Sequence, residues 1–206
     1  MQKIMFNDRY GLTQAVIEGR KTMTRRIELR GSEQRIVIPG GFKATSRHLI
    51  VRQNGQIIMS VPFRYKLGEI VAVAQSYQRI GISREYIDND PFGGLDKGWG
   101  NKMFVRADMM PHQIRIIGIK CERLQDISNE DCIKEGVCGE GIGFFVPGIK
   151  CKDWRKESHV DTEDGMTWKL FPTRRQAFAA LIDKISGRGT WERNPWVVVY
   201  EFGLVK

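Results

Sequence analysis

The chain has 206 residues, 41% of them hydrophobic and 28% charged, which is the ordinary composition of one globular domain. No apolar run reaches the roughly 18 residues of a membrane span, and the first residues lack the apolar stretch of a secretory signal. We therefore expect a cytoplasmic protein with no membrane partner. The formal net charge of +9 favours a polyanionic partner, such as RNA, or a nucleotide-type ligand.

The cysteines and histidines do not form a metal-binding pattern. The four cysteines, at 121, 132, 138 and 151, contain no CxxC pair, and no histidine follows them at zinc-finger spacing. We therefore expect buried or free thiols rather than a zinc site, and no metal or cofactor. The three histidines are scattered, which is typical of structural or exposed positions.

The first half of the chain predicts a strand over 1–6, a helix over 10–18 and a basic strand over 21–26. Gly19 suits the position after the helix, because glycine adopts positive φ without a Cβ clash. Asn54 and Gly55 predict a hairpin between strands over 47–52 and 56–63, on an insertion. A turn at 66–69 then leads into a buried strand over 70–75.

The second half begins with a stretch rich in Gly, Asp and Asn over 81–101, which predicts a loop that can serve as a lid. Strands are expected over 103–107 and 113–122. A helix capped by Ser128 and ended by Gly136 follows, then an irregular segment over 137–170. A helix over 173–185, with an apolar stripe formed by Phe178, Leu181, Ile182 and Ile185, precedes a last strand over 196–202.

These elements predict an α+β fold in which a small β-barrel carries two or three flanking helices. The whole chain, 1–206, is expected to form one domain. Two insertions, around 28–63 and 138–170, extend it.

A dense cluster of cations and hydroxyl groups occupies residues 20–26. Strand alternation places Lys21, Met23 and Arg25 on one face and Thr22, Thr24 and Arg26 on the other. Such a cluster is suited to holding an anion. The candidate ligand-binding residues of this segment are Arg20, Thr22, Arg25 and Arg26.

Residues 19–26 (Gly-Arg-Lys-Thr-Met-Thr-Arg-Arg) resemble the signature of the ASCH domain family, whose members have a PUA-like β-barrel fold. Residues 65–69 resemble the family's glycine-containing turn. Residues 123–128, with 130–131 and 134–137, resemble a block found in phage and prophage members, and residues 194–197 and 200–202 resemble their terminal strand. Residues 28–63, 81–101 and much of 138–170 have no counterpart in the resemblance.

The resemblance implies that RNA or a nucleoside-like ligand binds in a basic cleft. Some small family members are amidohydrolases that remove the acetyl group from N-acetylcytidine, whereas others are ribonucleases or RNA-binding proteins. In the amidohydrolases a lysine and a threonine of the signature act with a glutamate on the helix that follows the long strand. The matching residues here are Lys21, Thr24 and Glu135.

The chemistry of this set is plausible if burial or neighbouring cations lower the pKa of Lys21 from about 10.4. Lys21 would then take a proton from Thr24 or from water during attack on an amide carbonyl, and Glu135 would orient Lys21 or return the proton. Alternation separates Lys21 from Thr24 unless the strand is irregular at its start. In the simpler interpretation Lys21 and Thr24 only bind phosphate, and Glu135 forms a salt bridge or caps a loop.

One departure from the phage-type pattern concerns the strand over 70–75. Ala74 and Gln75 stand where those members have an arginine and a carboxylate. Gln75 can read a base edge by hydrogen bonding but cannot act as a base. Tyr77 and Trp99 are candidates for stacking on a base. The remaining aromatic residues near the last strand, Trp191, Trp196, Tyr200 and Phe202, are expected in the core, and residues 150–156 either follow a phosphate backbone or form a solvated flap.

Three functions therefore stay open. The first is binding of RNA or a modified nucleoside in a basic cleft. The second is catalysis, as an amidohydrolase of an N-acylated cytidine-type nucleoside or as a ribonuclease. The third is a phage accessory role, in which residues 28–63 or 138–170 bind a host protein.

Overall fold

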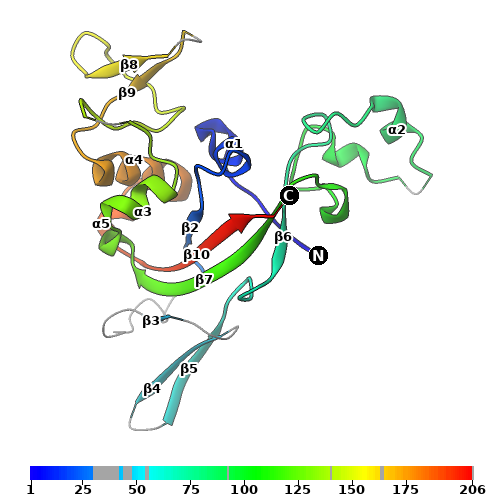
Figure 1. The fold of residues 1–206 in the computed structure, drawn as a ribbon, viewed down its shortest axis with the longest axis horizontal. Helices are drawn as coiled ribbons and strands as arrows, with labels where there is room; N and C mark the ends of the chain where they lie inside the picture. The colour runs from blue at the N-terminus through cyan, green and yellow to red at the C-terminus, as the bar shows by residue number, and fades with distance from the viewer. Residues whose placement is uncertain are drawn as a thin grey trace.

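A strongly curved mixed sheet forms the centre of the fold (Figure 1). The computed structural model describes residues 1–29, 42–43, 48–53, 56–91, 93–139, 141–162 and 165–205, with the backbone alone for those between 42 and 61. The strand order is β1-β6-β7-β10-β2, and β3 also pairs with β7. The strands are β1 (Gln2–Ile4), β2 (Met23–Arg26), β3 (Phe42–Lys43), β6 (Ile70–Val73), β7 (Gln113–Arg123) and β10 (Trp196–Leu204).

The sheet is mixed and, in the described strands, open. β1 and β6 run parallel, whereas the other neighbouring pairs are antiparallel. β1 and β2 form the two edges, and the Arg26 side chain connects them by donating from Nη2 to the carbonyl oxygen of Met5, at 2.8 Å. The predicted α+β fold is confirmed, and the barrel-like sheet remains unclosed between these edges.

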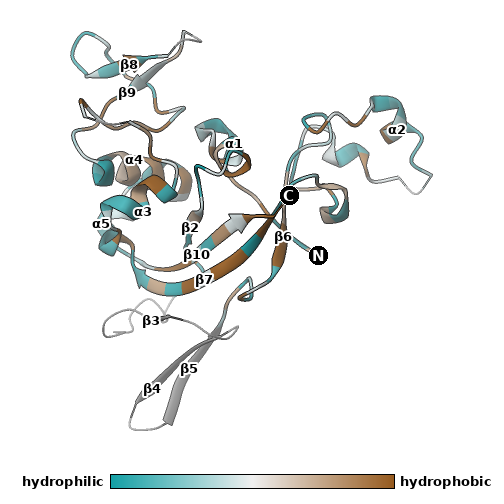
Figure 2. Cartoon of the chain, viewed as in Figure 1, coloured by the Kyte–Doolittle hydropathy of each residue, from teal (hydrophilic) through white to brown (hydrophobic). Residues whose placement is uncertain are grey.

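The long strands β7 and β10 carry the main core. Ile114 and Ile116 of β7 are fully buried, whereas Arg115 between them is exposed, as the period-two alternation of a strand requires. Val198 and Tyr200 of β10, which pair with Cys121 and Ile119 of β7, are also fully buried. Figure 2 shows hydrophobic residues along both strands. The sequence prediction of aromatic core residues is confirmed for Trp196, Tyr200 and Phe202, and Trp191 packs against the core while remaining partly exposed.

Four helices accompany this sheet. Ser128 and Thr173 cap α3 and α4, each accepting a hydrogen bond from the backbone N–H three residues later, at 3.1 and 3.2 Å. Phe178 and Leu181 of α4 are buried as predicted, whereas Ile185 is 41% exposed. The helices are α1 (Leu12–Ile17), α3 (Asn129–Lys134), α4 (Arg174–Ser186) and α5 (Thr190–Arg193), with 3₁₀ turns at Asp8–Tyr10 and Leu124–Asp126.

The segment between β6 and β7 folds around a small core of its own, which differs from the predicted loop over 81–101. It contains α2 (Arg84–Asp88) and 3₁₀ turns at Asp96–Gly98 and Ala107–Met109. The predicted strand over 103–107 is wrong. Lys3 donates from Nζ to the carbonyl oxygens of Met103 and Val105, at 2.7 and 2.6 Å, so these backbone groups bind a side chain instead of a strand.

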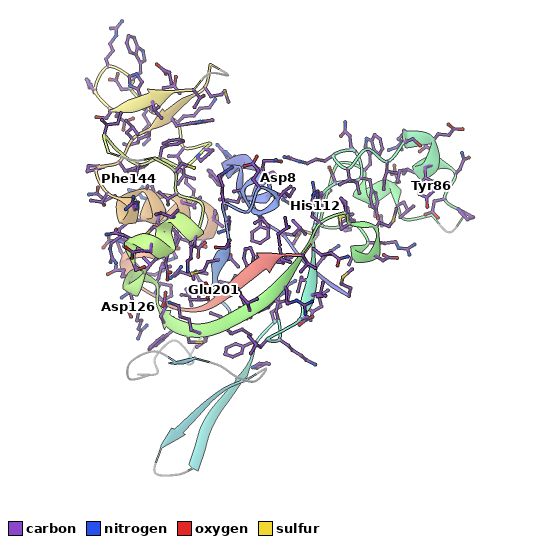
Figure 3. The ribbon with its side chains drawn as sticks, in the orientation of Figure 1. Asp8, Tyr86, His112, Asp126, Phe144 and Glu201 are labelled. Atoms are coloured by element: carbon purple, nitrogen blue, oxygen red, sulfur yellow. The ribbon has the colours of Figure 1, made fainter. Side chains whose placement is uncertain are left out.

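Two hairpins extend from the centre in the predicted insertions. β4 (His48–Gln53) pairs with β5 (Gln56–Pro62), as expected, although the predicted turn residues Asn54 and Gly55 lie outside the described residues. The predicted irregular segment over 137–170 contains β8 (His159–Asp161) and β9 (Thr167–Lys169). Phe144, labelled in Figure 3, lies against α4, with its ring centroid 4.7 Å from the Arg174 guanidinium carbon.

A substitution at Gly98 tests the packing of the small core between β6 and β7. A Cβ at Gly98 would overlap the fully buried Tyr77 ring, whereas a Cβ at Gly100 meets nothing within 4 Å. We expect Gly98→Ala to lower the free energy of unfolding by about 1–3 kcal/mol. Gly100→Ala, the matched control, should change it by less than about 0.5 kcal/mol. Urea denaturation measures both, and equal stability of the two variants would contradict this packing.

None of the helices among the described residues combines the length and the apolar character needed to cross a membrane.

Candidate active site

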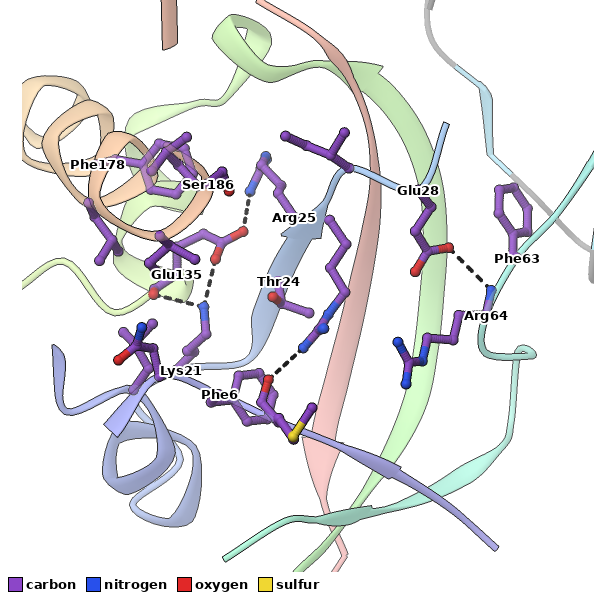
Figure 4. A pocket seen from close by; sticks show the side chains of 18 of the residues that line it. Phe6, Lys21, Thr24, Arg25, Glu28, Phe63, Arg64, Glu135, Phe178 and Ser186 are labelled. Carbon is purple, nitrogen blue, oxygen red and sulfur yellow. Dashed lines mark hydrogen bonds and ion pairs between the residues drawn. The ribbon is translucent and has the colours of Figure 1, made fainter. Parts of the chain in front are cut away.

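A cavity of about 980 Å³ lies between the open edge of the sheet and α4 (Figure 4). One wall comes from the segment after β1, a second from β2 and its continuation, and a third from the last turns of α4. The lining includes Met5, Phe6, Lys21, Thr24, Arg25, Arg26, Glu28, Arg64, Glu135, Phe178 and Ser186. The cavity therefore occupies the gap that leaves the sheet unclosed.

Lys21 and Glu135 meet in this cavity although 114 positions separate them in the sequence. Lys21 Nζ lies 2.6 Å from Glu135 Oε2 and 2.8 Å from the Glu135 carbonyl oxygen. Both side chains are almost fully buried, with 2% and 5% exposed. Glu135 ends α3, and Gly136 follows it at φ +100°, a conformation that favours glycine.

Backbone hydrogen bonds hold the segment before β2 against α1 and the end of α3. The Lys21 N–H donates to the Ala15 carbonyl and the Thr22 N–H to the Lys134 carbonyl, each at 2.9 Å. β2 begins only at Met23, so strand alternation does not govern Lys21. Strand alternation predicted that Lys21 and Thr24 would lie on opposite faces. Because the strand starts only after Lys21, the two residues line the same cavity. Figure 4 shows Thr24 on β2 beside the Lys21–Glu135 pair.

Arg25 is the centre of a buried ionic network. Its guanidinium contacts Glu122 Oε1 at 2.6 Å, Asp131 Oδ2 at 2.7 Å and Glu135 Oε1 at 3.1 Å, and its side chain is 0% exposed. Lys120 adds contacts to Glu122 and Asp131, at 2.8 and 3.3 Å. Arg25 borders the cavity, but its head group is bound by three carboxylates. Its expected role in binding an anion stays a prediction, and in this structure its donors serve these three carboxylates.

The environment of Lys21 lowers its pKa. Burial lowers the pKa of Lys21 below its ordinary value, and the positive charges of Arg25 and Arg26 act in the same direction, while Glu135 opposes the shift. For Asp131, burial acts to raise the pKa, but the hydrogen bond and charge of Arg25 bring it below the ordinary value. A lysine with a lowered pKa, a glutamate bonded to it and a nearby hydroxyl can together perform proton transfer to or from a bound substrate.

The opposite end of the cavity contains Arg26, Glu28 and Arg64. Glu28 Oε2 accepts hydrogen bonds from the Tyr200 hydroxyl at 2.7 Å and from the Arg64 N–H at 3.2 Å. Within the described chain, Glu28 Oε1 and Arg26 Nε are buried atoms without a hydrogen-bond partner. The sequence reasoning missed Glu28 and Arg64. Glu28 lies only two positions beyond the basic segment, which could have indicated its place in the site. Nothing in the sequence around Arg64 indicates that it lines the cavity.

Five expected ligand-binding residues lie away from the cavity lining. Arg20 forms an exposed ion pair with Glu18 at 2.5 Å. Gln75 is buried and its Oε1 lies 2.8 Å from His112 Nδ1. Tyr77 is fully buried, and its hydroxyl accepts from the Arg106 N–H at 2.9 Å.

The fourth of these residues, Trp99, packs against the core around Tyr77, with its ring centroid 5.4 Å from the Arg84 guanidinium carbon. Tyr77 and Trp99 therefore serve the small core between β6 and β7. The expected stacking of a base on Tyr77 is corrected, because no ring face is open. Thr22 also lies outside the lining, so the cavity includes Arg25 and Arg26 but not Thr22.

Among the described residues, no group of three or more His, Cys, Asp and Glu side chains is arranged to hold a metal ion. Comparisons of the chain with protein-family models, with curated proteins and with solved structures found no match.

Proposed function

We propose that this protein is an ASCH-type amidohydrolase with a PUA-like fold, acting on an N-acylated nucleobase. One observation carries the proposal: Lys21, Glu135 and Thr24 line one cavity, and Lys21 is bonded to Glu135 at 2.6 Å. Because carboxylates already neutralise Lys21 and Arg25, this end of the cavity favours an uncharged amide over a phosphate. The resemblance of residues 19–26 to the family signature supports the same conclusion.

The reaction proceeds in two steps. The neutral amine of Lys21 takes the proton of the Thr24 hydroxyl as Thr24 Oγ1 attacks the amide carbonyl carbon. The C–N bond then breaks, and the Lys21 ammonium returns the proton to the leaving amine, with Glu135 holding Lys21 in place. In the second step Lys21 takes a proton from water as the water oxygen attacks the carbonyl carbon of the Thr24 ester. The C–O bond to Thr24 then breaks, and the Lys21 ammonium returns the proton to Thr24 Oγ1 as the carboxylic acid is released.

The two threonines of the basic segment provide a matched test. Thr24 lines the cavity and Thr22 does not. With N-acetylcytidine as the substrate, Thr24→Ala should reduce acetate release by at least about 100-fold, because the nucleophile is lost. Thr22→Ala should retain activity, and Thr24→Ser should retain part of it. Chromatographic assay of cytidine formation measures all three, and equal activity of Thr24→Ala and the unmodified protein excludes this nucleophile.

Binding of RNA without hydrolysis is the second candidate. It is favoured by the arginines at the other end of the cavity, Arg26 and Arg64, which lie outside the carboxylate network. Titration with single-stranded RNA over a range of salt concentrations tests it, since phosphate contacts weaken as salt rises. Salt-sensitive RNA binding without deacetylation would favour this function over the first.

A further inference from the structure

The charges that line the cavity are compensated at one end only. Four cations and two carboxylates contribute to the lining. Lys21 and Arg25 are bonded to carboxylates at the end near α3. Among the described residues, neither Arg26 nor Arg64 has a carboxylate within ion-pair distance. The cavity therefore has a neutral end and a cationic end.

The two arginines are held in place without being neutralised. Arg26 donates from Nη2 to the Met5 carbonyl oxygen at 2.8 Å, a neutral acceptor. Arg64 is exposed, and its guanidinium carbon lies 5.7 Å from the centroid of the Tyr65 ring. Its backbone N–H donates to both Glu28 and the Tyr200 hydroxyl, and these bonds fix the position of the Arg64 backbone. Figure 4 shows the Arg64 side chain near Glu28 at this end of the cavity, and Arg26 lines the same cavity.

Glu28 is the one carboxylate among the described residues that line this end, and it forms no ion pair with either guanidinium. Its Oε2 accepts from the Tyr200 hydroxyl at 2.7 Å, and burial together with the Glu28 charge raises the pKa of Tyr200, so that this hydroxyl remains a donor. No ion pair joins Glu28 to Arg26 or Arg64. The guanidinium groups thus retain their donors for another acceptor, and arginine donors match the oxygens of a phosphate in geometry and charge.

We propose that the substrate is a nucleotide, with its acylated base at the Lys21–Thr24 end and its phosphate on Arg64 and Arg26. The assignment rests on the proposed amidohydrolase function and adds a second recognition element to the same site. A volume of about 980 Å³ lies at the upper end of the range for small-ligand cavities, so base, sugar and phosphate have room together. Arg64 selects the phosphorylated substrate, and it takes no part in the chemical step.

The test measures binding and hydrolysis separately. Calorimetry with cytidine and cytidine 5′-monophosphate reports on the phosphate subsite without requiring a reaction. Deacetylation of N-acetylcytidine and of its 5′-monophosphate reports on the proposed chemistry. Arg64→Gln is compared with Arg106→Gln, which removes the same charge from an exposed pair with Asp108 outside the cavity lining.

We expect the monophosphate to bind about tenfold more tightly than the nucleoside, a typical effect of one charge-assisted contact. Arg64→Gln should abolish this preference and leave nucleoside binding unchanged, whereas Arg106→Gln should preserve it. The preference should also shrink as salt rises. A trinucleotide with an internal acetylcytidine shows whether the phosphate belongs to a free nucleotide or to RNA.

The outcomes separate the two proposals. Arg64-dependent binding of the monophosphate without any deacetylation would retain the phosphate subsite and overturn the amidohydrolase. Deacetylation with equal affinity for cytidine and its monophosphate would retain the enzyme and overturn the subsite. Absence of monophosphate binding, or a preference that survives in Arg64→Gln, also overturns the subsite.

Discussion

Lys21→Met should reduce deacetylation by about 10²–10⁴-fold, the usual loss when a general base is removed. Methionine preserves most of the volume and the apolar contacts of the lysine chain. It removes the amine that lies 2.6 Å from Glu135 Oε2. Glu135 keeps its contact with Arg25 at 3.1 Å, so the carboxylate still has a charged partner. The measurement is the steady-state rate of cytidine formation from N-acetylcytidine.

Lys134→Met is the matched control for this change. Lys134 lies next to Glu135 in the sequence, but its Nζ pairs with Glu201 at 3.0 Å on a half-exposed surface. Its removal deletes the same charge from the same region and should leave kcat/KM within about twofold, because exposed pairs contribute little. Loss of activity in Lys134→Met equal to that in Lys21→Met would show that net charge, rather than Lys21 itself, controls the reaction.

The pH dependence of the unmodified enzyme provides a second readout for Lys21. Burial lowers the pKa of Lys21, and the base acts only when it is deprotonated. kcat/KM should therefore rise with pH and level off above the lowered pKa, which lies below the value of about 10.4 for an unperturbed lysine. A rate that continues to rise through pH 10.4 would contradict a buried, pKa-lowered base.

Arg25→Met is expected to lower the free energy of unfolding by about 3–5 kcal/mol, the largest stability effect that we predict. The guanidinium is fully buried and contacts three carboxylates, those of Glu122, Asp131 and Glu135. Without it, these groups retain only lysine partners, and their burial is no longer compensated. Chemical denaturation at neutral pH measures the loss.

Arg84→Met controls for the removal of an arginine that bridges two carboxylates. Arg84 pairs with Asp88 at 2.9 Å and Asp96 at 2.6 Å, but all three side chains are about half exposed or more. Because solvent screens such pairs, we expect a change of less than about 1 kcal/mol. A loss below about 1 kcal/mol in Arg25→Met as well would show that the buried network does not stabilise the fold.

Local sequence signals predicted most of the regular elements. Ser128 and Thr173 marked the starts of α3 and α4, and both side chains form the expected cap hydrogen bonds. Gly19, expected to end the first helix with positive φ, has φ +73°. These features depend on hydrogen bonds between residues three or four positions apart, so a short stretch of sequence contains all the information that they require.

The prediction of a strand over 103–107 was wrong because the conformation of this segment depends on residues that are far away in the sequence. Val105 and Ala107 belong to the small core around Tyr77, whereas Met103 and Phe104 are exposed. The carbonyl groups of Met103 and Val105 accept hydrogen bonds from Lys3, about a hundred positions away. The prediction that Tyr77 would stack on a base was wrong on the same grounds. An aromatic residue after a strand has no local feature that separates a core ring from a ligand-binding one.

The sequence by itself determined which groups are available for chemistry in residues 19–26, because a lysine, two threonines and three arginines are present whatever the fold. Only the tertiary structure decided their roles. Packing of α3 against β2 brings Glu135 to Lys21 and three carboxylates to Arg25, so both cations have anionic partners. Burial in the folded protein lowers the pKa of Lys21, and Glu135 opposes that shift. Arg26 lies outside that ionic network and lines the cavity together with Arg64. Burial and charge compensation depend on contacts across more than a hundred positions, and these form only when the chain folds.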